Sequence, residues 1–130
     1  KKFPEEAERV LERCKSNKEY LFDVERKIFG ASHAKVGGEL LRGWGLSSIL
    51  YESAYYHHRP GKAKDFPLVA MIIHVADSMV DEMGLGSSGE VIANPVKPKV
   101  LQELGLSELP VKQFEEEIKD QYETALAVFL

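Results

Sequence analysis

The chain has 130 residues, of which 44% are hydrophobic, and this length supports one domain with one core rather than two. Its formal net charge is −4, and no cluster of Lys and Arg is longer than Lys1-Lys2, which argues against nucleic-acid binding. No apolar run approaches the ~20 residues that span a bilayer, which argues against a membrane protein. The single cysteine, Cys14, excludes an internal disulfide and predicts a cytoplasmic location.

Glycines divide the chain into segments with helical periodicity, so we expect a single all-α domain over residues 1–130. The first helix is predicted over 4–16. The second is predicted over 18–29, with Asn17 as its N-cap and Gly30 after its last residue.

The third predicted helix begins after Ser32, which has the side chain of an N-cap, and ends at Gly45. One face of this helix is apolar and contains an imidazole; its residues are His33, Val36, Gly37, Leu40, Leu41 and Trp44. We expect the two leucines and the tryptophan to anchor the helix in the fold.

The fourth predicted helix begins at Ser47, carries His57 on its inward face, and stops at Arg59-Pro60-Gly61. The fifth, over 67–83, is apolar almost all round, which predicts a buried central helix. Residues 84–98 are rich in Gly, Ser and Pro and predict a mobile surface loop. Two further helices are expected, one over 98–104 and one over 110–129.

All four histidines of the chain lie in three short stretches on three predicted helices. The stretches are Ser32-His33-Ala34-Lys35-Val36-Gly37, Tyr56-His57-His58-Arg59-Pro60 and His74-Val75-Ala76-Asp77. Imidazoles and a carboxylate that meet from several helices are what a metal site in a helical bundle requires.

Each of these residues also has a purely structural interpretation, and both interpretations stay open. A carboxylate at Asp77 inside a buried helix has to be paired or bound to a metal, because an isolated buried charge is costly. Asp77 therefore either accepts hydrogen bonds from His57 or His58 or acts as a metal ligand. Similarly, His33 fits a core histidine bonded to the backbone, and tandem histidines stabilise a helix C-terminus when protonated.

Several of these motifs resemble a known family in order and spacing. Residues 25–37 and 40–46 are similar to the second half of an HDOD domain, the HD-related output domain of bacterial signalling proteins. His57-His58-Arg59-Pro60 and Val75-Ala76-Asp77 follow at matching distances, and the tail Leu101–Ser107 also resembles that family. The resemblance is strongest over residues 25–107.

The resemblance implies an HD-like bundle of about six to seven helices, related to the HD metal-dependent phosphohydrolases. In that superfamily and its HD-GYP phosphodiesterase branch, the positions of His33, His57, His58 and Asp77 bind metal. The chain departs from the enzymes, however, since it has no His-Asp doublet, no Gly-Tyr-Pro, and Arg59 where HD-GYP enzymes place a glutamate. HDOD domains generally resemble catalytically silent relatives that act beside receiver, PAS or GGDEF domains.

The resemblance thus predicts a non-catalytic signal-transduction output module that contacts protein partners and needs no cofactor. The alternative is a metal-dependent phosphohydrolase with a divalent metal, whose remaining ligands lie upstream of residue 1. A third interpretation is one structural metal ion held without turnover by His33, Asp77 and either His57 or His58.

The chain does not begin with methionine, and we expect it to be the C-terminal half of a larger HDOD domain. If helices that cover the His33 face are missing, apolar surface around Leu40, Trp44 and Leu50 is exposed. Because such patches favour association, we predict a homodimer or higher homo-oligomer.

Overall fold

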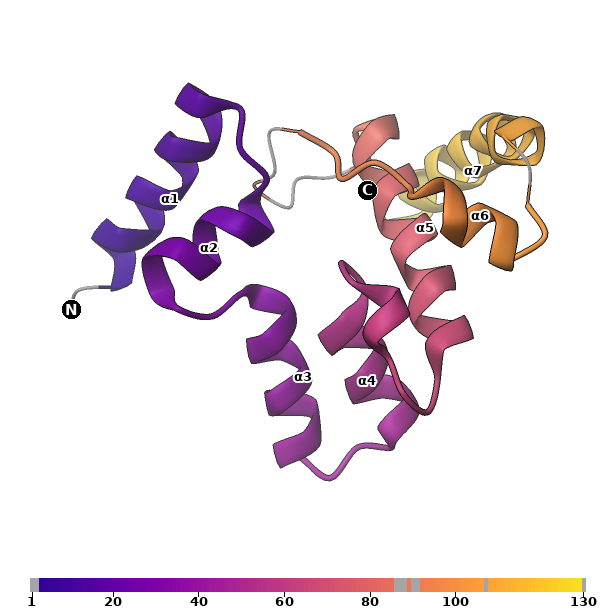
Figure 1. The fold of residues 1–130 in the computed structure, drawn as a ribbon. Coiled ribbons are helices and arrows are strands. Elements are labelled where there is room, and N and C mark those ends of the chain that lie inside the picture. Colours follow the sequence, from indigo (N-terminus) through magenta and orange to yellow (C-terminus); the bar gives the residue numbers. More distant parts are fainter. Residues whose placement is uncertain (1–2, 86–88, 90–91, 107, 130) are drawn as a thin grey trace. The chain divides into compact units, whose positions relative to one another are not determined.

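The computed structural model describes the backbone of residues 3–85, 89, 92–106 and 108–129 (Figure 1). These residues form helices and no strands, so the predicted all-α fold is confirmed. The elements in chain order are α1 Phe3–Asn17, α2 Leu21–Phe29, α3 His33–Gly43, α4 Ser48–Tyr56, the 3₁₀ turn η1 Pro60–Lys62, α5 Pro67–Met83, α6 Pro98–Glu103 and α7 Glu108–Phe129.

The chain groups into two compact units, Lys1–Pro95 and Val96–Leu130, and the prediction of a single domain over 1–130 stays a prediction. The second unit contains α6 and α7, and α7 begins at Glu108, before the predicted Pro110. Where the structure describes the predicted loop 84–98, it finds no helix before Pro98, the first residue of α6; residues 86–88 and 90–91 of that loop lie outside the described part. None of the helices in the described segments combines the length and the apolar character that a membrane span requires.

In the first unit, α1 and α2 pack through a small apolar core formed by Val10, Cys14, Leu21 and Val24. The predicted N-cap at Asn17 is wrong, because Asn17 is the last residue of α1 and Tyr20 precedes α2. The cause is Lys18, whose φ of 50° lies in the left-handed region and turns the chain away from a continuous helix. Gly30, at φ 73°, ends α2 as predicted.

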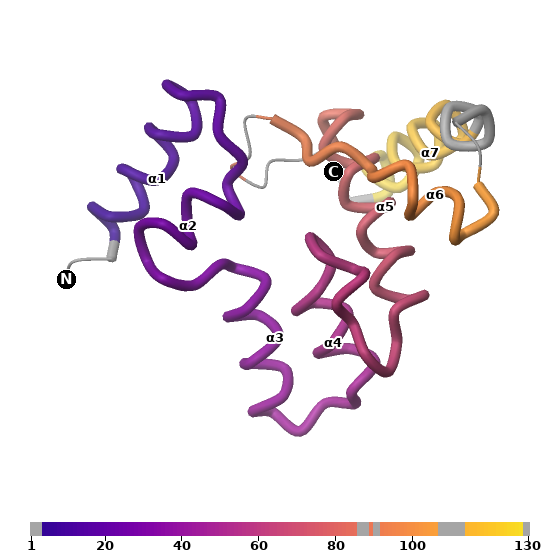
Figure 2. Tube along the Cα trace, viewed as in Figure 1, coloured from indigo at the N-terminus to yellow at the C-terminus, as the bar shows by residue number. Residues whose placement is uncertain are grey.

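Helices α3 and α4 lie side by side and run antiparallel in the ribbon and in the Cα trace (Figures 1 and 2). The predicted cap of α3 is confirmed, since Ser32 Oγ accepts a hydrogen bond from the backbone N–H of Lys35 at 3.3 Å. The close approach depends on Gly38, because a Cβ there would lie 2.7 Å from the Cβ of Tyr55. The antiparallel pairing brings the first residue of α3 to the same end as the last residue of α4.

The apolar face of α3 is mostly uncovered in this chain. Leu40 is 49% exposed and Trp44 is 70% exposed, so the prediction that they anchor α3 is wrong. Leu50 of α4 is 51% exposed as well. We expected these three residues to be exposed if no further helix covers this face, and in this structure they are.

Helix α5 is buried on one side only, which corrects the prediction of a fully buried central helix. Its inward side packs against α4 and η1 and contains Ala70, Met71, His74, Val75, Ser78 and Met79. Leu68, Ile72, Ile73 and Val80 are exposed on the rest of the helix. The sequence is apolar all round, but only one face has a neighbour within the described part of the first unit.

Candidate functional site

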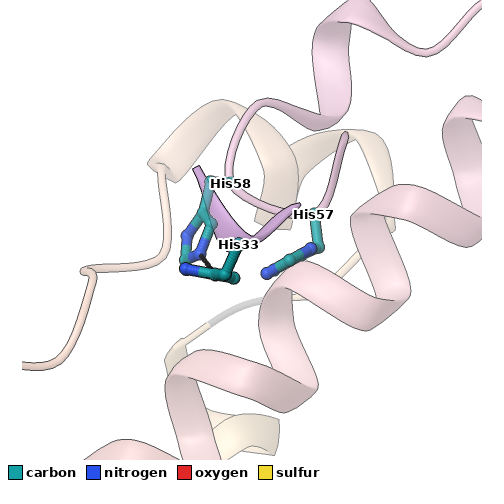
Figure 3. Close-up of side chains that lie close together, drawn as sticks. All are labelled: His33, His57 and His58. Carbon is teal, nitrogen blue, oxygen red and sulfur yellow. Dashed lines mark hydrogen bonds between the residues drawn. The ribbon is translucent and has the colours of Figure 1, made fainter. Parts of the chain in front are cut away.

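Three imidazoles meet at the common end of α3 and α4. His33 is the first residue of α3, and His57 and His58 follow directly after the last residue of α4. One ring nitrogen from each lies within 4.8 Å of the others, and Figure 3 shows the three rings facing one another. We call this group the histidine cluster. It assembles because α3 and α4 are antiparallel neighbours.

Glu25 of α2 orients the ring of His33. Its Oε2 lies 2.7 Å from His33 Nδ1 and accepts the backbone N–H of the same residue at 2.8 Å. Since a carboxylate accepts, Nδ1 of His33 carries a proton, and the neutral ring presents the lone pair of Nε2 to the cluster. A carboxylate on the far nitrogen of a histidine is the usual support of a metal ligand.

The ring of His57 is protonated at the same nitrogen as the ring of His33. Its Nδ1 lies 2.7 Å from the carbonyl oxygen of Ala54, which can only accept, so Nδ1 is protonated and Nε2 holds the lone pair of the neutral ring. Burial lowers the pKa of His57, and the nearby His33 lowers it further. The Ala54 carbonyl and the charge of Asp77 raise it, but the net effect is a lowered pKa. A lowered pKa keeps the imidazole neutral, which is the form that binds metal.

His58 completes the cluster from its buried side. It is 7% exposed, whereas the side chain of His33 is 38% exposed, so the cluster reaches from the interior to the surface. The Nε2 atoms of His33 and His58 are 2.8 Å apart and share a hydrogen bond. Because the proton of His33 is on Nδ1, the Nε2–H of His58 donates to Nε2 of His33, and a bound ion would have to replace this proton. Two nitrogens bound to one tetrahedral ion at about 2.0–2.1 Å lie about 3.3 Å apart, so a small outward movement would admit an ion.

Asp77 comes from α5 and lines the same cavity of about 240 Å³ as the three histidines, together with Asp81. Burial raises the pKa of Asp77, His57 opposes this, and the carboxylate of Asp81 adds to it. Asp77 and His57 therefore interact through charge, while Nδ1 of His57 bonds to the carbonyl of Ala54. His74, the remaining histidine, is buried on α5 and does not belong to the cluster.

Chemically, the cluster offers the lone pairs of Nε2 of His33 and His57 and a nearby carboxylate, and His58 joins them once its proton moves from Nε2 to Nδ1. Such a set suits one transition-metal ion. Two ions need more ligands than this set provides. The metal role predicted for His33, His57, His58 and Asp77 stays a prediction, but the residues fit one ion.

Two glutamates in the first unit were not predicted. Glu25 holds His33, and Glu52 of α4 accepts the backbone N–H groups of Lys64, Asp65 and Phe66 at 2.9, 3.0 and 2.6 Å. Glu52 is 5% exposed and fixes the segment that leads into α5, which carries Asp77. No short-range sequence pattern predicts the role of either residue, because each one bonds to residues outside its own helix.

Comparison with known proteins gives one match. The family model of the HDOD domain, the HD-related output domain, matches residues 1–60, which include the whole histidine cluster but not Asp77. No curated protein and no solved structure matches the chain. The match overlaps the resemblance described above over residues 25–60. Over residues 1–60, the chain is therefore similar to the HDOD family.

Proposed function

We propose that the chain is a non-catalytic output module of a bacterial, cytoplasmic signalling protein and that it works by contact with protein partners. The supporting observation is the α3 stripe, which we define as Val36, Leu40 and Trp44. Val36 and Leu40 lie on one side of α3, and Trp44 follows four residues later, directly after the last residue of the helix. The three residues are 51%, 49% and 70% exposed. Exposed large apolar side chains in a continuous row are typical of a protein-interaction surface.

Leu46 and Leu50 add exposed apolar surface in the following turn and on α4. A partner that covers the stripe would bury the indole of Trp44, and buried tryptophans are among the strongest contributors to interfaces. A second copy of this chain and another helix of the parent protein are both partners of this kind.

The donor set of the cavity supports a non-catalytic function. Two-metal hydrolysis needs ligands that bridge and surround both ions. The chain offers three imidazoles and a half-buried Asp77 around the cavity, and its sequence has no His-Asp doublet. A protein of this composition is better equipped to hold a fold together than to activate water between two ions.

Hydrolysis of bis(4-nitrophenyl) phosphate tests this proposal. We expect the untagged chain and its parent protein to give, with added Mn²⁺, the same rate as Mn²⁺ alone. The variant Asp77→Ala should leave that rate unchanged. A metal-dependent rate that disappears in Asp77→Ala would overturn the proposal and identify a phosphohydrolase.

The histidine cluster supports a second candidate, a single metal ion held without turnover or as part of a hydrolase completed upstream. The observation in its favour is the orientation of His33 by Glu25 and of His57 by Ala54, which leaves both Nε2 lone pairs toward the cluster.

Elemental analysis of untagged protein purified without chelators tests this candidate. We expect the wild-type protein to contain about one equivalent of Zn²⁺ or Mn²⁺. The metal should be lost in His57→Gln and retained in His74→Gln, which changes the histidine outside the cluster. Protein without bound metal after incubation with either ion would contradict it.

A further inference from the structure

A second cavity of the first unit has a composition unlike the rest of the chain. Its volume is about 390 Å³, and it lies between α2, the turn into α3, the end of α4 and η1. All of the charged side chains that line it are cations: Arg26, Lys35, Arg59 and Lys62. The chain as a whole has a net charge of −4, so the charge of this cavity is opposite in sign to that of the chain. We call it the basic pocket.

Phe22 holds the two guanidinium groups of the basic pocket in place. The Cζ atoms of Arg26 and Arg59 lie 5.6 and 5.0 Å from the centre of its ring, within the range of cation–π attraction. This stacking fixes two long side chains that otherwise lose rotamer freedom on binding. The pocket is therefore partly preorganised for a ligand that both arginines can contact.

The guanidinium groups keep N–H donors for such a ligand. The nearest carboxylate is Asp23, whose Oδ1 lies 3.7 Å from Arg26 Nη1 and 3.9 Å from Arg59 Nη2. Both distances exceed the roughly 3.2 Å limit of a good hydrogen bond. Asp23 thus offsets part of the charge without occupying the donors.

Two tyrosines supply a different kind of surface. Tyr55 and Tyr56 line the basic pocket, and their ring centres are 4.8 Å apart with an interplanar angle of 51°. Arginines suit phosphate because their planar N–H groups bind two oxygens at once, and aromatic rings suit a flat organic group. The volume lies within the roughly 300–1,000 Å³ range of small-molecule sites.

We propose that the basic pocket binds a small organic phosphate, a monoester whose phosphate group contacts the arginines and lysines and whose aromatic body packs on the tyrosines. This site is separate from the histidine cluster. The cavity that contains the cluster and the basic pocket share no lining residue, although the ring of Phe22 lies 4.7 Å from that of His58.

Adenosine monophosphate, titrated into the untagged chain in the presence of EDTA and followed by calorimetry, tests the proposal. We expect saturable binding with a Kd of about 1 mM or tighter, and binding of inorganic phosphate and of adenosine at least about tenfold weaker. The double variant Lys35→Gln/Lys62→Gln changes only exposed side chains and should weaken binding about tenfold, because two charge contacts are lost.

The matched control is Arg42→Gln, which removes an exposed cation of α3 that pairs with Glu39 outside the pocket. It should leave the affinity unchanged, and far-ultraviolet circular dichroism should confirm that every variant is folded. Failure to saturate at about 10 mM would overturn the proposal. Equal weakening in the control and in the double lysine variant would do the same, and inorganic phosphate bound as tightly as the nucleotide would refute the aromatic contact.

Discussion

The carboxylate of Glu52 makes the clearest prediction about stability. It accepts three backbone N–H groups, from Lys64, Asp65 and Phe66, and it is almost fully buried. Hydrogen bonds to a charged group contribute about 1.5–3 kcal/mol each, but the three share one acceptor and are not additive. We therefore expect Glu52→Ala to lower the free energy of unfolding by about 3 kcal/mol, and Glu52→Gln by about half of that.

The same contacts predict a dependence on pH. Burial raises the pKa of Glu52, but the three backbone N–H groups outweigh it, so the pKa in the folded chain is lower than its ordinary value. A group with a lowered folded pKa stabilises the fold above its unfolded pKa, near 4.3, and this contribution is lost as the pH falls through the folded value. The wild-type chain should thus lose stability relative to Glu52→Gln below about pH 4.3.

Urea unfolding followed by circular dichroism measures the global effect. Trp44 is a poor probe here because its indole is already mostly exposed in the folded chain. Amide hydrogen exchange measures the local effect, since the N–H groups of Lys64, Asp65 and Phe66 should exchange faster in both variants. If these three amides exchange equally slowly in wild type and Glu52→Ala, the reasoning is wrong.

Three further predictions follow from other contacts. Burial of an exposed indole is worth about 2–4 kcal/mol, so Trp44→Ser should weaken self-association in sedimentation velocity at least about tenfold. Leu68→Ser is the control, and a monomeric wild type would contradict the predicted oligomer. Gly38→Ala should lower the free energy of unfolding by about 1–3 kcal/mol because its methyl group meets a tyrosine of α4. Gly37→Ala, which has open space, should instead stabilise α3 by up to about 1 kcal/mol; equal effects in urea unfolding would refute this. Hydrogen bonds from a guanidinium of α1, a lysine of α2 and an asparagine lower the pKa of Glu19 to about 2, so carbon-detected NMR should find its titration midpoint there, and a midpoint near 4.3 would contradict the contacts.

Local signals in the sequence were sufficient for most helix ends. Gly30 ends α2 and Ser32 caps α3 because both act within a few residues of themselves. The start of α2 was misplaced because a left-handed Lys18 leaves no clear mark in the sequence. The turn η1 was missed for a similar reason, since the Arg59-Pro60-Gly61 stop signal predicts a break but not the 3₁₀ turn that follows it.

Burial was predicted less well than helix formation. Apolar periodicity correctly identified one face of α3, but a pattern cannot tell whether a neighbour covers that face, and Trp44 is exposed. The histidines were identified from their motifs, and the antiparallel packing of α3 and α4 brings His33, His57 and His58 together. The residues that hold the site, Glu25 and Glu52, bond across elements, so neither had a spacing to recognise.

The bonds of Glu52 also have a consequence for how the two cavities are connected. They join α4 to residues 12 to 14 positions further along the chain, so the segment between them is a closed loop with both ends fixed to one helix. That segment contains His57 and His58, which line one cavity, and Arg59 and Lys62, which line the other. A disulfide across a loop of this length contributes about 3 kcal/mol. The hydrogen bonds of Glu52 close the segment in the same way, and they fix residues of both cavities. Unlike a disulfide, they are not broken by a reducing agent.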